Sequence, residues 1–493
     1  MKNLIRGAAL LVAVCCAVWL AVLWRWRATG HDMTAEDFVI YLLLLPLVVF
    51  GFVLALRWAW RGAVAQQAAA AASPAAAGAS PGAAAPGQAV AAEEAQRHAT
   101  AQLLCAHLLC ACADSPQALL AAGQSGQPLP GLDASLQNAE GLPVMSARIP
   151  DLPVDAMRAA LTSLQRSVRR AGRDAGAVPL TLDDDAPMEP PAEHLQRALA
   201  ALQAPLMQAL QSLQPWHERF ADPTNISLLR VLLACPAWWS EGDSALAEAW
   251  LRQLLADEGS SGIAPARFVI DCQALGSVEL WAEADRRLHS LNRDKRRDLL
   301  LLAACHSDLS DDAIAMLESQ RRLFSPGQHP KGLIPSEAAA VLVLAPPDWP
   351  AAPDAATPPV QLHRPAVMKR DKSIEAAGSV SSQVLAEVLA AALGAAQLQV
   401  AEVAAVVCDA DQHTPRGTEL FGTTLKVLPH LDPAEHLCMT GGVAGHGEAG
   451  ALMVVATAAV RALADQKPCL GLALGDSHWR LALLARPPQA STP

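Results

Sequence analysis

Four side chains in the apolar run QLLCAHLLCACA could bind a metal ion by their types. Cys105, His107, Cys110 and Cys112 lie within eight residues of one another, and thiolate and imidazole are the ligands that zinc prefers. No second ligand pair follows at the spacing of a zinc finger. We therefore expect these side chains to pack in a core, where free cysteine behaves as a small hydrophobic residue, and we predict no metal.

A second candidate for ion binding is the acidic run Asp183-Asp184-Asp185, which lies in a Pro-rich stretch. We expect a solvated loop there rather than a cation site. The sequence has no Gly-rich phosphate loop and no HExxH. It therefore gives no sign of a nucleotide cofactor or a catalytic zinc, and we predict no cofactor.

Two segments near the N-terminus have the length and composition of membrane spans. Gly7 to Trp24 and Phe38 to Leu56 carry no charge, and each is close to the ~20 residues that cross a bilayer core. Tryptophans and arginines flank both segments, and basic residues outside the pair outnumber those between them. We expect a two-helix transmembrane hairpin with spans at about 5–25 and 38–57. It would place the protein in a bacterial inner (cytoplasmic) membrane as a multi-pass protein, bound to lipid, with its main domain facing the cytoplasm.

The charge of the chain limits its partners. The formal net charge is −11, although basic residues exceed acidic ones in the first 62 residues. The remainder is therefore strongly acidic, and such a body repels nucleic acid, so we predict no nucleic-acid partner. Eleven cysteines are scattered without a framework spacing, which favours reduced thiols over a disulfide scaffold.

Composition divides the chain into five parts. The hairpin (1–62) is followed by an Ala/Pro/Gly-rich linker (63–92), and a Pro/Ala-rich stretch (345–365) separates two larger parts (93–344 and 366–486). Apolar runs that suggest buried strands alternate with helical patterns in both larger parts. This alternation predicts a layered α/β domain with sheets buried between helices. The clearest predicted strands are 298–304, 338–344, 403–408, 469–474 and 479–485, and the clearest predicted helices are 194–213, 278–291, 380–393 and 449–463.

Three blocks of this order resemble the ketosynthases (3-oxoacyl-ACP synthases) of the thiolase-like superfamily. Ser336 to Leu344, SEAAAVLVL, is similar to the family's GEGAGVLVL strand, and Gly441 to Ala451, GGVAGHGEAGA, to its KSxxGHxxGAAG segment. Residues 472–485 resemble its terminal strand pair. The resemblance covers about residues 260–486. It implies an αβαβα layered fold whose two halves are 93–344 and 366–486.

The resemblance also implies a cysteine nucleophile at a helix N-terminus, where the helix dipole lowers the pKa of the thiol. Cys272 follows the apolar run FVID and precedes a predicted helix, so it is the candidate nucleophile. An alignment anchored on Gly276 places Gln273 at that position instead. A buried thiol at the end of a strand is the simpler interpretation of Cys272.

Two histidines and a lysine complete the site that the resemblance implies. Gly445-His446 matches the family's Gly-His, but its lysine position falls on Gly441. His413 lies in the loop expected to carry the other histidine. Aligning Thr414-Pro415 with the family's Thr-Pro moves that position to Ala410, and a solvated loop residue is then the simpler interpretation of His413.

Because two parts of this constellation are missing, the sequence favours a membrane-anchored, catalytically degenerate ketosynthase-like protein. It would act by binding a protein partner, an acyl carrier or an acyl ligand in an envelope or secretion process, and it could form a homodimer. One alternative is an acyltransferase or condensing enzyme that uses Cys272 and His446 on acyl thioesters. Another is a purely structural membrane-anchored interaction protein.

Overall fold

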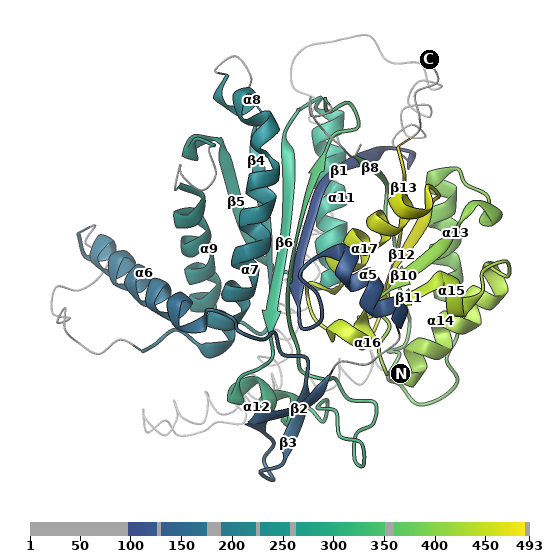
Figure 1. Ribbon diagram of the computed structural model, residues 1–493, viewed down its shortest axis with the longest axis horizontal. Coiled ribbons are helices and arrows are strands. Elements are labelled where there is room, and N and C mark those ends of the chain that lie inside the picture. The colour runs from purple at the N-terminus through teal and green to yellow at the C-terminus, as the bar shows by residue number, and fades with distance from the viewer. Residues whose placement is uncertain are drawn as a thin grey trace, which may run out of the picture. The chain divides into compact units, whose positions relative to one another are not determined.

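The computed structural model describes residues 97–125, 130–174, 189–222, 227–256, 263–350 and 359–488. One mixed sheet of 11 strands runs through these residues, and a two-stranded sheet lies apart from it. Figure 1 shows the large sheet with helices on either side. The small sheet pairs β2 (Gly131–Gln137) with β3 (Pro143–Ser146), beside α12 (Asp311–Ser319).

The N-terminal half contributes five strands in the order β5-β4-β6-β7-β1. β4 is parallel to β5 and β6, whereas β7 is antiparallel to both β6 and β1. If these five strands are numbered as they occur along the chain, their order in the sheet is 3-2-4-5-1. The fifth strand, β7, runs antiparallel to the other four. The strands are β1 (Thr100–Cys110), β4 (Leu229–Cys235), β5 (Phe268–Ala274), β6 (Leu299–Ser307) and β7 (Glu337–Ala345).

The C-terminal half repeats this order. β10 is parallel to β11 and β12, and β13 is antiparallel to β12, β8 and β9. The two halves meet where β1 pairs with β8 in antiparallel register, Thr100 opposite His363. The strands are β8 (Val360–His363), β9 (Ala366–Lys369), β10 (Ala405–Cys408), β11 (Leu437–Met439), β12 (Cys469–Ala473) and β13 (Trp479–Arg486).

Three hydrophobic cores separate the layers. One lies between the N-terminal strands and the outer helices α6, α7 and α9, and another lies between the C-terminal strands and α13 and α14. The third holds α5, α11 and α17 between the two sets of strands. The helices are α5 (Pro116–Ser125), α6 (Val154–Asp174), α7 (Glu193–Ser212), α9 (Glu241–Ala256), α11 (Ser277–Arg293), α13 (Gln383–Ala396), α14 (Thr414–Val427) and α17 (Gly450–Asp465).

Side-chain alternation along the strands explains this layering. In β6, Leu300, Leu302 and Ala304 face the central core, whereas Leu299 and Leu301 face the outer one. All nine residues of the strand are buried, because helices cover both faces of the sheet. The chain thus has the layered α/β arrangement that the sequence predicts, built twice.

The predicted membrane hairpin is not part of the fold that the structure supports. None of the described helices is both long enough and apolar enough to cross a membrane. The long helices α6 and α7 have 21 and 20 residues, but both carry charged side chains. Residues 5–25 and 38–57, on which the prediction rested, lie outside the described residues, as do Asp183-Asp184-Asp185. We therefore correct the fold class to the layered α/β body alone and withdraw the multi-pass inner-membrane location.

Candidate functional site

The candidate site lies where the carboxyl ends of parallel strands meet the loop before α17. His446 stands in this loop, between the short helix α16 (Gly441–Ala444) and α17. Asp409 follows β10 directly, and His306 is the next-to-last residue of β6. Gly475 lies in the turn between β12 and β13. The fold thus brings together side chains that are far apart in the sequence.

Glycines allow this close packing. A Cβ at Gly475 would lie 2.4 Å from Cε1 of His446 and 2.9 Å from Oδ2 of Asp409. Gly445 has a φ of 83°, and a Cβ there would lie 2.3 Å from Cβ of Ser336. Both positions exclude a larger side chain, because atoms already occupy the space and Gly445 needs a left-handed backbone.

Ser336 connects the imidazole of His306 to the backbone of His446. Its hydroxyl donates a hydrogen bond to the carbonyl oxygen of His446 at 2.9 Å. Oγ of Ser336 also lies 3.2 Å from Nε2 of His306. Ser336 is fully buried, so this contact fixes the position of the loop and does not offer a nucleophile.

The histidines of the site are held neutral. Burial lowers the pKa of His446 well below its usual value, and the positive field of Arg416 lowers it further. Burial alone lowers the pKa of His306 to about 4. His413 also has a lowered pKa, because burial and Arg416 outweigh the opposing effect of Asp411. Neutral imidazole can donate or accept a hydrogen bond, so these rings could hold a carbonyl group.

Three carboxyl groups lie in the same region with raised pKa values. Burial raises the pKa of Asp308 to about 8 and of Glu448 to about 7. Burial also raises the pKa of Asp409, although its Oδ1 accepts hydrogen bonds from the amides of Leu474 and Gly475. Protonated carboxyls can donate hydrogen bonds, which adds donors to those of the imidazoles.

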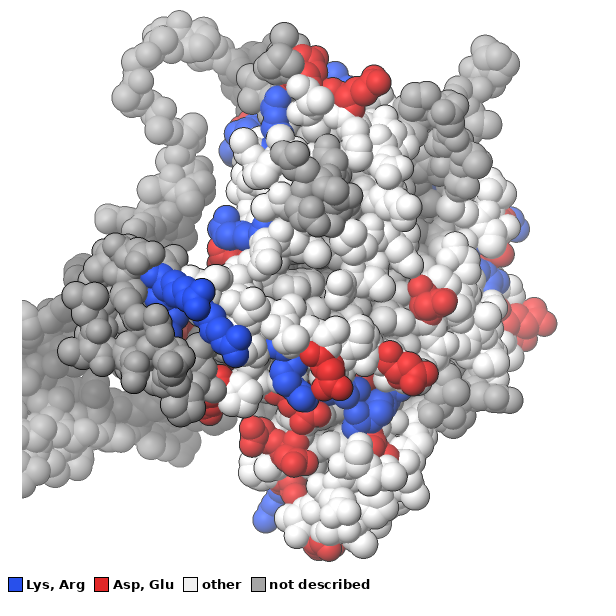
Figure 2. All heavy atoms as spheres, turned by 60° about the vertical axis from the view of Figure 1, so that its left-hand side comes forward, with Lys and Arg blue, Asp and Glu red and all other residues white. Residues whose placement is uncertain are grey.

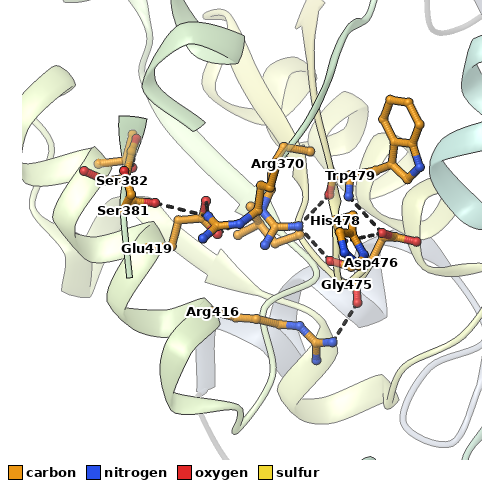
Figure 3. A network of polar contacts seen from close by, with 12 residues as sticks. Arg370, Ser381, Ser382, Arg416, Glu419, Gly475, Asp476, His478 and Trp479 are labelled. Atoms are coloured by element: carbon orange, nitrogen blue, oxygen red, sulfur yellow. Dashed lines mark hydrogen bonds and ion pairs between the residues drawn. The ribbon is translucent and has the colours of Figure 1, made fainter. Parts of the chain in front are cut away.

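Arginines fix the turn that carries Gly475. Arg416 of α14 donates to the Gly475 carbonyl at 2.7 Å and forms an ion pair with Asp411 at 2.6 Å. Figure 3 shows this arginine reaching the turn. Glu419 of α14 pairs with Arg480 at 2.8 Å and with Arg370. The backbone of Arg370 also donates to the carbonyl of His478 at 2.7 Å.

Cys272 lies away from this cluster. It sits inside β5 and packs against the outer core together with Phe268 and Ile270. Its neighbour Asp271 pairs with Arg287 of α11 and so faces the central layer. Burial raises the pKa of the Cys272 thiol, and Cys235 and Glu248 of α9 add to this effect. α11 begins at Ser277, with Gly276 before it, so Cys272 is not at the helix N-terminus.

His413 differs from the solvated loop residue expected as the simpler interpretation. It is only 2% exposed, directly precedes α14 and has an unpartnered Nδ1. It lines a cavity of about 350 Å³ that is open to solvent. Ionisable side chains surround this cavity, and most of them are basic: Arg321, Arg322, His329, Lys331 and Glu375. The structure therefore places His413 and His446 in one region and Cys272 in another layer.

Sequence reasoning did not identify His306, Asp308, Asp409 or Glu448 as members of this region. His306 ends a run of buried apolar residues, LLLLAAC, and a polar residue at the end of a buried strand is a usable signal. Asp308 and Asp409, which directly follow β6 and β10, give the same signal. Glu448 gives none, because it lies in a loop and its proximity to the others depends on the tertiary fold. The described residues contain no group of three side chains suited to a metal ion.

Comparisons with known proteins give structural matches only. No protein-family model and no curated protein matches the chain. The ishigamide ketosynthase/chain length factor is 14% identical, covering 79% of this chain and 100% of that chain, with a TM-score of 0.48. A type II PKS acyl-carrier protein in complex with its ketosynthase matches at 13% identity, 79% and 100% coverage and a TM-score of 0.49. A ketosynthase from Xenorhabdus doucetiae in complex with its chain length factor matches at 14% identity, 79% and 98% coverage and a TM-score of 0.46.

The strand order, repeated in both halves, and the five alternating layers make the fold thiolase-like and ketosynthase-like. This confirms the layered αβαβα fold that the sequence resemblance implied.

Proposed function

We propose that this protein is a ketosynthase-like binding protein that holds an anionic thioester, such as an acyl carrier presents, without condensing it. The observation that supports this most is the position of Cys272. Its side chain packs on the α9 side of β5, in the outer core. His446 instead lies with Asp409 and His306 beside α17. A thiol nucleophile needs a nearby base and a lowered pKa, and Cys272 has neither.

The cavity beside His413 supports the ligand class. Arg321, Arg322 and Lys331 line it, with Glu375 as the acidic member of its lining. The excess of positive charge favours an anionic group such as a phosphodiester. Arg322 of this cavity also interacts electrostatically with His446 and Glu448. The neutral imidazole of His446, and the carboxyl of Glu448 in its protonated form, can donate hydrogen bonds to a thioester carbonyl.

Binding and mass measurements test this proposal. We expect the full chain to bind an acyl phosphopantetheine thioester more tightly than the same thioester without its phosphate, as measured by calorimetry. Lys331→Ala should weaken binding of the phosphorylated form by about fivefold, the effect of one partly exposed charge pair of ~1 kcal/mol. Lys467→Ala, which removes an exposed lysine from a different cavity, is the matched control.

Intact-mass analysis after incubation with the thioester should show no covalent adduct. An acyl group on Cys272 would overturn the proposal in favour of an acyltransferase that uses Cys272 and His446. Equal binding with and without the phosphate, or no effect of Lys331→Ala, would contradict the proposal that the ligand is an anionic thioester.

A further inference from the structure

The turn that ends β1 brings two thiols together. The backbone amide of Cys110 donates to the carbonyl of Ala113 at 2.8 Å, and the amide of Ala113 donates back at 3.3 Å. Ala111 and Cys112 form the centre of this tight turn. The two sulfur atoms, Sγ of Cys110 and Sγ of Cys112, lie 3.6 Å apart. They belong to the apolar CxHxxCxC cluster, to which the proposed function gives no role.

The rest of that cluster is separate. Cys105 packs toward the outer core, and Nε2 of His107 lies 3.0 Å from the hydroxyl of Ser212 on α7. Cys110 and Cys112 instead belong to the central core. The four side chains thus divide between the two faces of the sheet, so the pair acts as a dithiol and not as part of a larger ligand set.

The two thiols also differ in reactivity. A hydrogen bond from Cys110 lowers the pKa of Cys112, and the same contact together with burial raises the pKa of Cys110. Cys112 is half-buried, whereas Cys110 is 2% exposed. The pKa of the thiol is instead raised to about 12 at Cys105 and Cys235 and to about 11 at Cys438, chiefly by burial. Thiolate is the reacting form of cysteine, so Cys112 is favoured as the attacking sulfur.

We propose that Cys110 and Cys112 form a reversible thiol–disulfide switch that exchanges with small-molecule disulfides such as oxidised glutathione. The Cys112 thiolate attacks the disulfide, forms a mixed disulfide and releases one thiolate. Cys110 then loses its proton and attacks the Cys112 sulfur, forming the internal disulfide and releasing the second thiolate. Two electrons pass to the small molecule, which leaves as two thiols. The sulfur atoms need to approach from 3.6 Å to about 2.05 Å.

The switch would reach the candidate site through α5. This helix follows the turn directly and packs against α17, α16 and β11. At Gly123 it lies so close to β11 that a Cβ would be 2.5 Å from Sγ of Cys438. α16 and α17 flank His446. Tightening the turn would therefore shift a helix that supports the loop carrying His446.

Oxidation of the full chain tests the proposal. The reduced protein is incubated with oxidised glutathione at neutral pH, its free thiols are alkylated, and its peptides are analysed by mass spectrometry. We expect an internal Cys110–Cys112 disulfide in the wild type. Cys110→Ser should trap glutathione on Cys112, because the resolving thiol is gone, whereas Cys112→Ser should leave Cys110 unmodified. Cys438→Ser, which alters a thiol outside the pair, should oxidise like the wild type.

Two outcomes would overturn the proposal. One is a wild type in which both thiols stay free under these conditions, and the other is glutathione on Cys110 in the Cys112→Ser variant. If Cys110→Ser does not fold, the wild-type peptide result decides alone. Amide hydrogen exchange tests whether the thiol pair acts on the candidate site through α5. The amides of α5 should exchange at different rates in the oxidised and reduced proteins. Equal rates would overturn the proposed link from the turn to the loop that carries His446.

Discussion

At the scale of single residues, the candidate site is a region where burial keeps ionisable groups uncharged. His306 and His446 lose their protons at lower pH than usual, and Asp308 and Glu448 keep theirs to higher pH. Charged forms are disfavoured when water is excluded, so acids and bases shift in opposite directions. Such shifts are frequent at functional sites, and here they accompany converging side chains and an adjacent cavity.

The carboxyl groups predict how stability depends on pH. In the unfolded chain both ionise near pH 4, whereas in the folded protein the pKa is about 8 for Asp308 and about 7 for Glu448. Between about pH 6.5 and 8 the folded state therefore holds more protons, and the free energy of unfolding falls as pH rises. The histidines with lowered pKa values act in the opposite sense, because unfolded histidine still binds protons near pH 6.5, and this opposition fades as the pH rises toward 8.

Urea denaturation across this pH range checks the effect. The double variant Asp308→Asn/Glu448→Gln should remove the contribution of the two carboxyls to this pH dependence, which we expect to be about 1–2 kcal/mol. Asp294→Asn, at an exposed carboxyl, should leave the slope unchanged. An unaltered slope in the double variant would show that other groups hold the protons.

At the scale of elements, a buried ion triad joins α14 to the end of the sheet. Glu419 and Arg480 are both 0% exposed and lie 2.8 Å apart, and Arg370 pairs with the other oxygen of Glu419. The Arg480 side chain also donates to the carbonyl of Asp476, and the backbone amide of Arg370 donates to the carbonyl of His478. Both carbonyls lie in the β12–β13 turn. The triad thus holds the turn that contains Gly475, whose lack of a side chain makes room for His446.

Breaking the triad should be costly. Glu419→Gln leaves two buried guanidinium groups without their carboxylate, and we expect it to lower the free energy of unfolding by about 3–5 kcal/mol. The matched control is Glu248→Gln, at an exposed pair with Arg252 on α9, which should cost less than about 1 kcal/mol. Chemical denaturation measures both. Similar losses for the two variants would contradict the role given to the triad.

At the scale of the whole molecule, the described residues form two like halves that share a core. Residues of both sets of strands and of α11 and α17 belong to the central core, and β1 pairs directly with β8. On the face shown in Figure 2, acidic and basic side chains lie interspersed among wide uncharged stretches. The absence of a nucleic-acid partner and the homodimer stay predictions from the sequence.

The shared core predicts cooperative unfolding of the two halves. Far-UV circular dichroism and tryptophan fluorescence should follow one coincident transition in urea, because neither half can bury its central face alone. Trp281 on α11 and Trp479 on β13 report on the N-terminal and C-terminal halves. A resolved second transition would mean that the halves fold independently.

The sequence alone determined most element types and their order, and with them the family resemblance. β6, β7, β12 and β13 are visible as short apolar runs because helices cover both faces of the sheet, and the long helices have their own periodicity. Only the tertiary structure decided what lies beside what. β8 falls inside the segment predicted as the 345–365 linker, because a four-residue strand is too short to show a pattern. β1 overlaps the cysteine-rich run, whose residues are apolar on both faces of the sheet and so show no clear alternation.

The same limit applies to the site. Successive residues of a strand face opposite layers, so the register of β5 decided that Asp271 faces α11 while Cys272 faces α9. Strand order decided that His306 and His446, 140 residues apart, share Ser336. Those choices depend on pairing between distant segments, which local sequence does not encode, and they separated the candidate thiol from the histidines.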